Sequence, residues 1–247
     1  AAGAASGGCR STLEVGAYCG YSAIRTAMAP GARVTSIEAD AVHAMIARSI
    51  VEFAGLSRSV EVLIGHSSEL LPALARCATP PRFDGVLLDA RGSGYEQMLG
   101  DLEGLGLLAT RAVVVADNVL KPGAPLFLWR VTAGSGWDTR IVSVGEYAMP
   151  AEDWMSVSVR TPGAGGDRPG AAPQVVRRLH READRMRARA GVDPGSSVSF
   201  GEWAAFAVRM RAGLAEAGIA PTEERVGGPV DGGALAGSVA LARTRKK

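Results

Sequence analysis

Short apolar runs alternate with longer helical patterns along the first 160 residues of the chain. The runs predict strands at Thr12–Val15, Arg33–Ile37, Val60–Ile64, Gly85–Leu88 and Ala112–Ala116. The last two are continuously apolar, which is typical of strands buried on both faces of a sheet. Around these strands, the spacing of apolar residues predicts helices at Tyr21–Met28, Ala41–Ala54, Ser68–Arg76 and Pro125–Val131. This alternation predicts an α/β fold with a doubly wound, mostly parallel sheet.

The pattern changes after the fifth strand. Thr139–Val144 and Met155–Arg160 are β-rich runs separated by about ten residues, which is short enough for an antiparallel hairpin at the edge of the sheet. A stretch rich in glycine and proline then extends from 161 to 170 and is typical of a linker. We therefore divide the chain into a sheet domain, residues 1–162, and a linker with a helical, partly disordered extension, residues 163–247.

The extension differs from the sheet domain in charge. Residues 1–162 carry a net charge of −3, and residues 163–247 carry +5. Helices are predicted at the arginine-rich Gln174–Arg189 and at Phe200–Ile219, and the Arg243–Lys247 tail is expected to be disordered. The basic helix fits either a solvated face or a surface for an acidic partner. The second helix is expected to pack on the sheet or on the basic helix.

Composition argues against several classes of protein. With 247 residues, of which 47% are hydrophobic and 21% charged, the chain has average globular usage, unlike disordered or fibrous proteins. No run of 18 apolar residues is present, so no membrane span is expected. A net charge of +2 does not favour nucleic acid as a partner. Cys9, Cys19 and Cys77 lack metal-binding spacing and the first residues lack a secretory signal, so we expect a cytoplasmic protein with reduced thiols. The start of the chain also fits a truncated N-terminus.

Polar residues follow the predicted strands at their carboxyl ends, where ligands bind in such sheets. The turn after the first strand has the spacing Gly16-x-x-x-Gly20 and lacks the G-x-G-x-x-G of a pyrophosphate cradle. Glu38 closes the second strand, where a carboxylate can accept hydrogen bonds from both hydroxyls of a ribose. Taken singly, the glycines fit an ordinary turn and Glu38 fits a helix start. Together they favour a nucleoside-type cofactor.

A second polar group follows the fourth and fifth strands. Asp89, Asp117 and Asn118 offer two carboxylates and an amide oxygen, which are hard ligands suited to Mg²⁺ or Ca²⁺ rather than zinc. The alternative is that the two aspartates are N-caps of the helices that follow. The sequence thus indicates a candidate divalent-cation site beside a candidate cofactor site.

Several of these segments resemble the catechol O-methyltransferase family. The similarity runs from about residue 11 to 160 and is carried by Leu13–Ser22 (LEVGAYCGYS), Phe53–Leu56, Leu87–Asp89, Ala116–Val119 (ADNV) and Pro122–Pro125 (PGAP). It implies a Rossmann-like methyltransferase fold, with S-adenosylmethionine and Mg²⁺ as cofactors and a catechol-type small molecule as acceptor. In the implied reaction, a phenolate attacks the sulfonium methyl group in line.

Matched by position, the resemblance assigns roles to individual residues. The cofactor set is Glu14, Gly16, Tyr18, Ser22, Glu38, Gly65, Ser67, Ser68 and Asp89. The metal ligands are Asp89, Asp117 and Asn118. The substrate set is Asn118, Glu146 and Pro122, although Glu146 also fits an exposed loop and Pro122 a simple turn.

The chain departs from the family pattern in two places. Gly92 stands where the family has a lysine general base, and Arg91 cannot replace that base because its guanidinium stays protonated. No catalytic residue is therefore assigned. His66 is a candidate base that also fits a turn. If the site has no general base, methyl transfer is expected to slow by about 10²–10⁴-fold. The family also has helices before the first strand that cover the cofactor, whereas this chain has ten residues there.

Three functions remain open at this point. The first is an S-adenosylmethionine- and Mg²⁺-dependent catechol O-methyltransferase. The second is a weak or inactive binding or scaffold protein on the same fold, suggested by Gly92 and the missing helices. The third is an O-methyltransferase with a different small-molecule acceptor. The oligomeric state is not indicated by the sequence.

Overall fold

The sheet is eight-stranded, and most neighbouring strands in it are parallel. In the computed structural model, which describes residues 10–145, 151–163, 168–191 and 198–224, the strand order is β3-β2-β1-β4-β5-β7-β6-β8. The strands are β1 (Ser11–Val15), β2 (Arg33–Glu38), β3 (Val60–Ile64), β4 (Phe83–Leu88), β5 (Leu108–Ala116), β6 (Trp137–Gly145), β7 (Glu152–Arg160) and β8 (Glu223–Glu224). β7 runs antiparallel to both β5 and β6, so the predicted α/β fold and its hairpin are confirmed.

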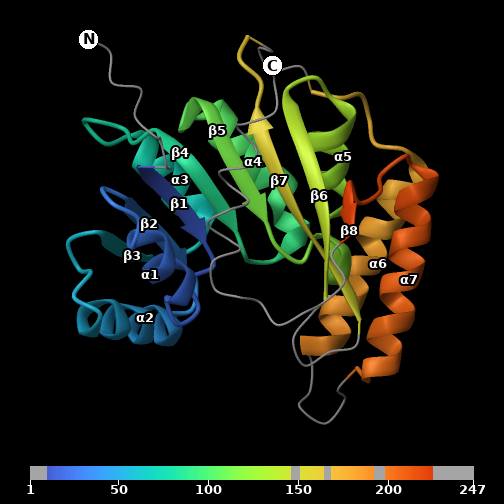
Figure 1. Ribbon diagram of the computed structural model, residues 1–247, viewed down its shortest axis with the longest axis horizontal. Coiled ribbons are helices and arrows are strands. Elements are labelled where there is room, and N and C mark those ends of the chain that lie inside the picture. The colour runs from blue at the N-terminus through green and yellow to red at the C-terminus, as the bar shows by residue number, and fades with distance from the viewer. Residues whose placement is uncertain (1–9, 146–150, 164–167, 192–197, 225–247) are drawn as a thin grey trace.

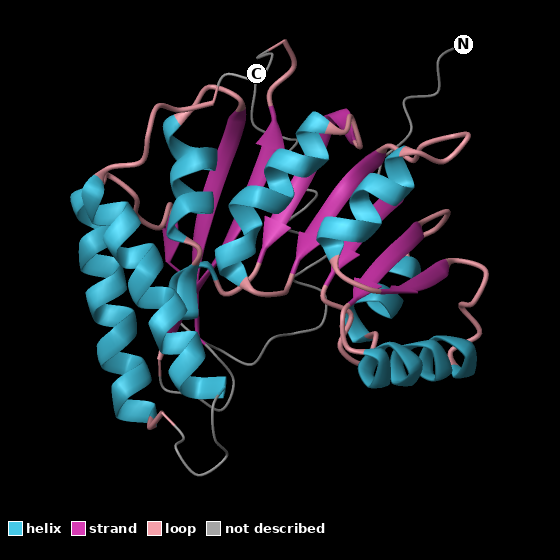
Figure 2. Ribbon diagram, turned by 180° about the vertical axis from the view of Figure 1, so that it is seen from behind, coloured by secondary structure: helices cyan, strands magenta, loops and turns pink. Residues whose placement is uncertain are grey.

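Helices lie on both faces of the sheet (Figures 1 and 2). One face is covered by α3 (Ser67–Ala75), α4 (Tyr95–Gly104) and α5 (Pro125–Ala133), which lie side by side in Figure 2. The other helices are α1 (Tyr21–Ala27) on the opposite face, α2 (Ala41–Phe53) near β2 and β3, and α6 (Gln174–Gly191) and α7 (Phe200–Glu216), packed together at the β6 side. Two short helical turns, η1 (Gly92–Gly94) and η2 (Val119–Gly123), follow β4 and β5. No helix in the described part of the chain is long and apolar enough to cross a bilayer.

The two central strands, β4 and β5, carry fully buried side chains. Leu88 and Val114 have no exposed surface, because helices cover one side of this part of the sheet and apolar runs of this kind are suited to such a position. The two strands are in register with Leu88 opposite Ala116. The next residues, Asp89 and Asp117, therefore emerge next to each other at the carboxyl edge of the sheet.

The C-terminal helices share the core of the sheet. Leu179 of α6 and Met210 of α7 belong to the same apolar cluster as Val114 of β5. β8 pairs with β6, and Thr222 accepts a hydrogen bond from Ile141 N (3.1 Å) and donates its own N–H to Ile141 O (2.8 Å). The second helix thus packs on the sheet core as well as on the basic helix. The boundary after residue 162 stays a prediction, and the Arg243–Lys247 tail lies outside the described residues.

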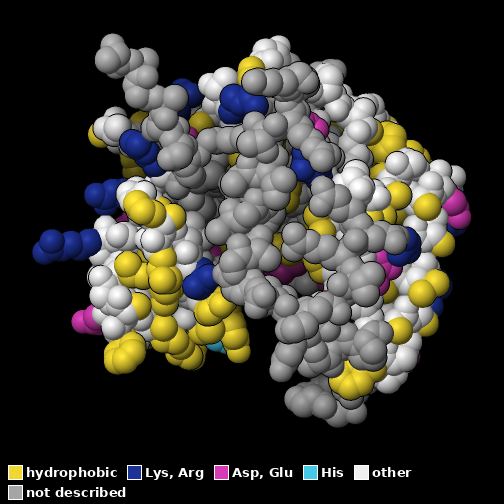
Figure 3. Space-filling model, viewed as in Figure 1, with side chains coloured by type: hydrophobic (Ala, Val, Ile, Leu, Met, Phe, Trp, Pro, Cys, Tyr) yellow, Lys and Arg dark blue, Asp and Glu magenta, His cyan; other side chains and the backbone are white. Residues whose placement is uncertain are grey.

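The α2 helix has apolar residues on its outer face as well as its inner face. Figure 3 shows hydrophobic side chains gathered on the surface over this helix. The exposed ones on α2 are Val42, Met45, Ile46, Ile50 and Phe53. The buried face is built of small residues, and a Cβ on Gly20 would lie only 3.3 Å from Ala47, so α2 packs close to the start of α1. Asp40 begins α2 by accepting hydrogen bonds from the backbone N–H groups of the first turn.

The apolar pattern of the sequence does not predict α4. Tyr95, Leu99 and Leu102 are buried there at helical spacing, but the segment also contains Gly100 and Gly104, which lower the helical propensity of a stretch with few apolar residues. Packing against the neighbouring helices α3 and α5 stabilises α4 instead.

Candidate active site

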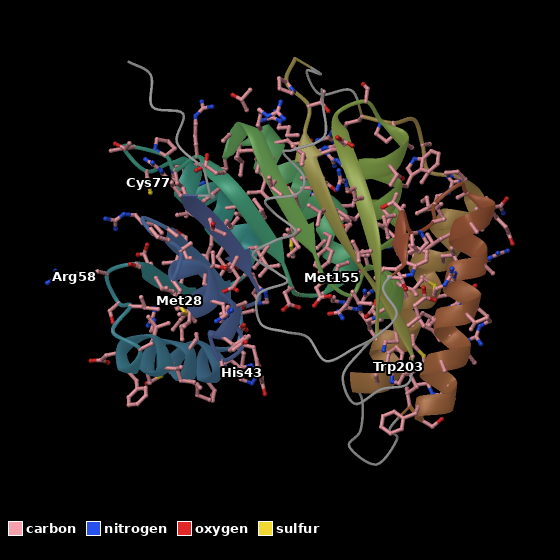
Figure 4. All side chains as sticks on the ribbon, viewed as in Figure 1. Met28, His43, Arg58, Cys77, Met155 and Trp203 are labelled. Carbon is pink, nitrogen blue, oxygen red and sulfur yellow. The ribbon has the colours of Figure 1, made fainter. Side chains whose placement is uncertain are left out.

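A pocket of about 430 Å³ opens at the carboxyl end of β1. It is lined by Gly16, Ala17, Tyr18, Cys19, Tyr21, Ser22, Glu38 and Asp89. We call it the strand-end pocket. Five of these residues belong to the predicted cofactor set, whereas Ala17, Cys19 and Tyr21 were not in it. The ring of His43, labelled in Figure 4, packs edge-on against Tyr18 with 4.8 Å between centroids, and so supports that side of the pocket.

Gly16 allows β1 and β4 to approach each other at the floor of this pocket. Its φ is +104°, and a Cβ built on it would lie 1.9 Å from Asp89 O. The Gly16 N–H donates to Ile37 O (2.9 Å), and Asp89 N–H donates to Val15 O (2.9 Å), so the turn is held from both sides. Only glycine fits here, and this explains the first glycine of the motif.

Glu38 is oriented by backbone groups on the opposite wall. Its two carboxylate oxygens accept hydrogen bonds from Tyr18 N (2.8 Å) and Asp40 N (2.9 Å). A carboxylate has further lone pairs, so Glu38 can still accept from a ligand while held in place. Tyr18, whose N–H donates to Glu38, has a φ of +46°, which is unusual for a residue other than glycine. This strained turn brings a backbone N–H into the pocket wall.

Glu14 lies buried directly behind the pocket. It accepts a hydrogen bond from the hydroxyl of Ser36 in β2, a partner that the sequence analysis did not identify. Burial raises the pKa of Glu14 above its usual value. Its second oxygen, Oε1, is buried without a hydrogen-bond donor in the part of the chain that the structure describes. An unsatisfied buried acceptor beside a pocket is suited to a ligand that carries an N–H or ammonium donor.

Asp89 and Asp117 lie together between this pocket and the end of β5. Burial at the strand ends, and then the charge of Asp117, raise the pKa of Asp89 to about 6. Neither aspartate is the N-cap of the helical turn that follows it, because the N-caps are Arg91 for η1 and Asn118 for η2. Asp117 Oδ1 instead accepts a hydrogen bond from Asn118 N (2.8 Å). Two repelling carboxylates at the same edge are suited to a shared cation.

Asn118 is oriented by a residue that the sequence analysis did not identify. Its Nδ2 donates to Asp153 Oδ2 (2.9 Å), so its amide oxygen is left to act as an acceptor. Asp153 is 1% exposed, and its other oxygen accepts from Lys121 N (3.0 Å) and Trp154 N (2.7 Å). Among the described residues no group of three or more His, Cys, Asp or Glu is suited to a metal. The present set has two carboxylates and one amide oxygen, and this chemistry fits Mg²⁺.

Comparisons with known proteins place this arrangement in a family. A family model described as O-methyltransferase matches residues 6–126. A catechol O-methyltransferase from Sus scrofa is 38% identical over 155 residues, which is 62% of this chain and 83% of the pig protein. The chain belongs to the catechol O-methyltransferase family. It is also 43% identical over 128 residues to the Bos taurus catechol O-methyltransferase, covering 51% of this chain and 47% of the bovine protein. The chain therefore spans only about half the length of several curated catechol O-methyltransferases that it matches.

Solved structures agree with this placement and confirm the Rossmann-like fold. An O-methyltransferase from Bacillus cereus in complex with SAH has a TM-score of 0.56 at 25% identity, covering 62% of this chain and 74% of that one. The O-methyltransferase TomG from Streptomyces achromogenes, in complex with SAM, has a TM-score of 0.55 at 27% identity with the same coverage. The roles that the sequence predicts for individual residues of this chain stay predictions.

The remaining predicted residues lie at varying distances from the strand-end pocket. Gly65 is held beside Glu38 by its N–H, which donates to Glu38 O (2.9 Å). Ser67 and Ser68 begin α3 just beyond it and are not among the residues that line the pocket. Pro122 is half-buried in η2, close after Asn118. Glu146 lies outside the described residues.

Asp153→Asn is expected to weaken Mg²⁺ binding by about 10–100-fold, the usual effect of removing a partner that orients a metal ligand. The new amide can keep the two backbone hydrogen bonds through its oxygen, but its NH₂ group then faces the NH₂ of Asn118. The Asn118 amide is expected to turn over and present a donor to the cation. Burial raises the pKa of Asp153 to about 6, so at pH 7.5 the ionised carboxylate is less favourable in the folded state than in the unfolded state. The neutral Asn variant should therefore have a free energy of unfolding at pH 7.5 no lower than that of the wild type. Calorimetric Mg²⁺ titration and urea unfolding test this, with the exposed Asp138→Asn as the control; an unchanged Mg²⁺ affinity would contradict the orienting role.

Proposed function

We propose that this chain is an S-adenosylmethionine- and Mg²⁺-dependent O-methyltransferase that acts on catechol-type small molecules. The observation that carries the proposal is the position of Asp89, which lines the strand-end pocket and also lies beside Asp117. One residue thus connects a nucleoside-type pocket with a hard-oxygen cation site. Relatives named catechol O-methyltransferase, and O-methyltransferases solved with SAM or SAH, support the same assignment.

Different residues of the chain would bind the ribose, the methionine part of the cofactor and the cation. Glu38, held by two backbone N–H groups, is placed to accept hydrogen bonds from ribose hydroxyls. Glu14, with its unsatisfied oxygen, is placed to accept from the ammonium group of the methionine part. Asp89, Asp117 and Asn118 would hold Mg²⁺, which when bound lowers the pKa of a coordinated hydroxyl.

The residue at position 92 distinguishes this chain from the family pattern, which has a lysine there as general base. Gly92 provides no side chain that could take a proton, and this favours a slow enzyme or, as the second candidate function, a binding protein. Holding the acceptor oxygen in line with the sulfonium methyl group still supplies rate through proximity and orientation. We therefore expect catalysis that depends on positioning more than on general-base chemistry.

Calorimetry with S-adenosylmethionine and a radiolabelled methyl-transfer assay with catechol, each with and without Mg²⁺, test the proposal. Cofactor binding with turnover that a chelator abolishes supports it. Cofactor binding without turnover favours the binding protein. Turnover that is insensitive to the chelator favours a different acceptor chemistry.

The affinity for Mg²⁺ is expected to depend on pH near 6. Because the pKa of Asp89 is raised to about 6, a proton competes with the cation below that value. The dissociation constant should rise by up to about tenfold for each pH unit below 6 and be nearly constant above 7. Mg²⁺ titrations at pH 5, 6 and 7.5 measure this; equal affinities at all three pH values would show that Asp89 has an ordinary pKa.

A further inference from the structure

The α6 helix inserts an arginine between the two loops that follow β4 and β5. Arg187 has a side chain that is only 11% exposed, and its Nη2 donates to the backbone oxygen of Gly123 at the end of η2. A Cβ built on Gly92 would lie 2.6 Å from the same nitrogen and 2.9 Å from the Gly123 oxygen that this nitrogen contacts. The guanidinium therefore occupies the space beside Gly92 that a side chain there would need.

Asp184, one turn earlier on α6, extends this contact into an ion-pair network. Its Oδ1 lies 3.5 Å from Arg187 Nη1 and 3.6 Å from Arg91 Nη2. His180 approaches its other oxygen at 3.9 Å. Asp184 thus joins the loop after β4 to the helix, while Arg187 joins the helix to the loop after β5. We name this arrangement the Asp184–Arg187 clamp.

The clamp is connected to the candidate metal ligands through short stretches of backbone. Gly123 N–H donates to Asn118 O (3.1 Å), so the residue that Arg187 contacts is itself bonded to a ligand residue. On the other loop, Tyr95 packs with no exposed surface, and its hydroxyl exchanges hydrogen bonds with both Ala90 N and Ala90 O (2.9 Å each), directly after Asp89. Both loops are therefore fixed at the end near the ligands and at the end near α6.

We infer that Arg187, held by Asp184, is a positioning residue that sets the separation of Asp89 from Asp117 and Asn118, and with it the affinity for a divalent cation. This inference rests on the proposed function, because it needs the cation site. It makes the C-terminal helix part of the machinery of the site. It also explains Gly92: a lysine introduced there would not restore a base but would displace Arg187.

The main test compares Arg187→Met with Arg185→Met, an exposed arginine on the same helix. Calorimetric titration with Mg²⁺ and, separately, with S-adenosylmethionine is expected to show Mg²⁺ affinity lowered by about 10–100-fold in Arg187→Met, as for other residues that orient metal ligands. Cofactor affinity should change less than about threefold, and Arg185→Met should change neither. Unchanged Mg²⁺ affinity in folded Arg187→Met, or equal losses of both affinities, would overturn the inference.

Gly92→Ala approaches the same contact from the other loop. Its methyl group should displace the guanidinium and press on the Gly123 oxygen at the end of η2, and so reproduce the loss of Mg²⁺ affinity. The double variant should lose little more than either single variant, because residues in contact are not additive. Additive losses would show that Gly92 and Arg187 act separately, against the inference.

Hydrogen exchange in the cation-free protein separates this inference from the proposed function. Arg187→Met is expected to exchange faster at residues 90–95 and 118–124 than the wild type, with β3 and α3 unchanged. If the wild type binds no Mg²⁺, the proposed function is wrong. If Arg187→Met leaves exchange in both loops unchanged, the inference about the Asp184–Arg187 clamp is wrong.

Discussion

Asp117→Ala is expected to lose more than about 100-fold in Mg²⁺ affinity, which exceeds the usual effect of an orienting partner because a charged ligand is removed. Methyl transfer to catechol should fall by about 10²–10³-fold, since several kcal/mol of charge stabilisation disappear with the cation. The pKa of Asp89 should also fall from about 6 toward its ordinary range, because the charge of Asp117 contributes to the rise.

Three measurements on one variant test this expectation. Calorimetry gives the Mg²⁺ and S-adenosylmethionine affinities, a methyl-transfer assay gives kcat/KM, and carboxyl NMR gives the pKa of Asp89. Cofactor binding should stay within about threefold of the wild type, because Asp117 is not among the residues that line the strand-end pocket. The exposed Asp138→Ala serves as control. An Mg²⁺ affinity equal to that of the wild type would refute the assignment of Asp117 as a ligand.

Gly16→Ala is expected to lower the free energy of unfolding by about 2–6 kcal/mol, the sum of about 1–3 kcal/mol of backbone strain and a similar amount for overpacking. The added methyl group would lie 1.9 Å from Asp89 O and 2.7 Å from Asp89 C, and neither atom can move without shifting β4. That is a large share of the usual total stability of a protein. The variant should also lose S-adenosylmethionine binding, because Gly16 and Asp89 both line the pocket.

Gly31→Ala is the matched control for this prediction. Gly31 has a φ of +76°, and a Cβ there would meet no atom within 4 Å. It should show only the strain of a positive φ, about 1–2 kcal/mol, with unchanged cofactor binding. Urea unfolding and calorimetry of both variants test this. Equal losses of unfolding free energy in the two variants would mean that the close contact of Gly16 with Asp89 O adds nothing to the strain of a positive φ.

The arrangement of residues at the ends of the strands is predictable from the sequence. Continuous apolar runs locate β4 and β5, and parallel pairing then requires Asp89 and Asp117 to be neighbours. The glycine spacing after β1 fits an ordinary turn or a cofactor site, and the contact that requires Gly16, with Asp89 O, is known only from the structure. Local pattern and sheet topology are sufficient to predict that the two aspartates are neighbours.

The partners that orient these residues are not predictable in this way. Asp153 meets Asn118 across 35 residues, and Arg187 meets Gly123 across 64. No periodicity connects such pairs, since their meeting depends on how the hairpin and α6 pack after the strands have formed. In the sequence, Arg187 is one of several arginines on a basic helix, and only its burial distinguishes it from the exposed ones.

The short β8 strand has a consequence for self-association. Without it β6 would be the last strand of the sheet, and an unpaired strand edge is a template on which a second chain can add its own strand. Thr222 and the residues that follow it occupy the hydrogen-bonding groups around Ile141 and Val142. The chain thereby blocks the middle of this edge with its own backbone and discourages the first step of sheet-to-sheet aggregation.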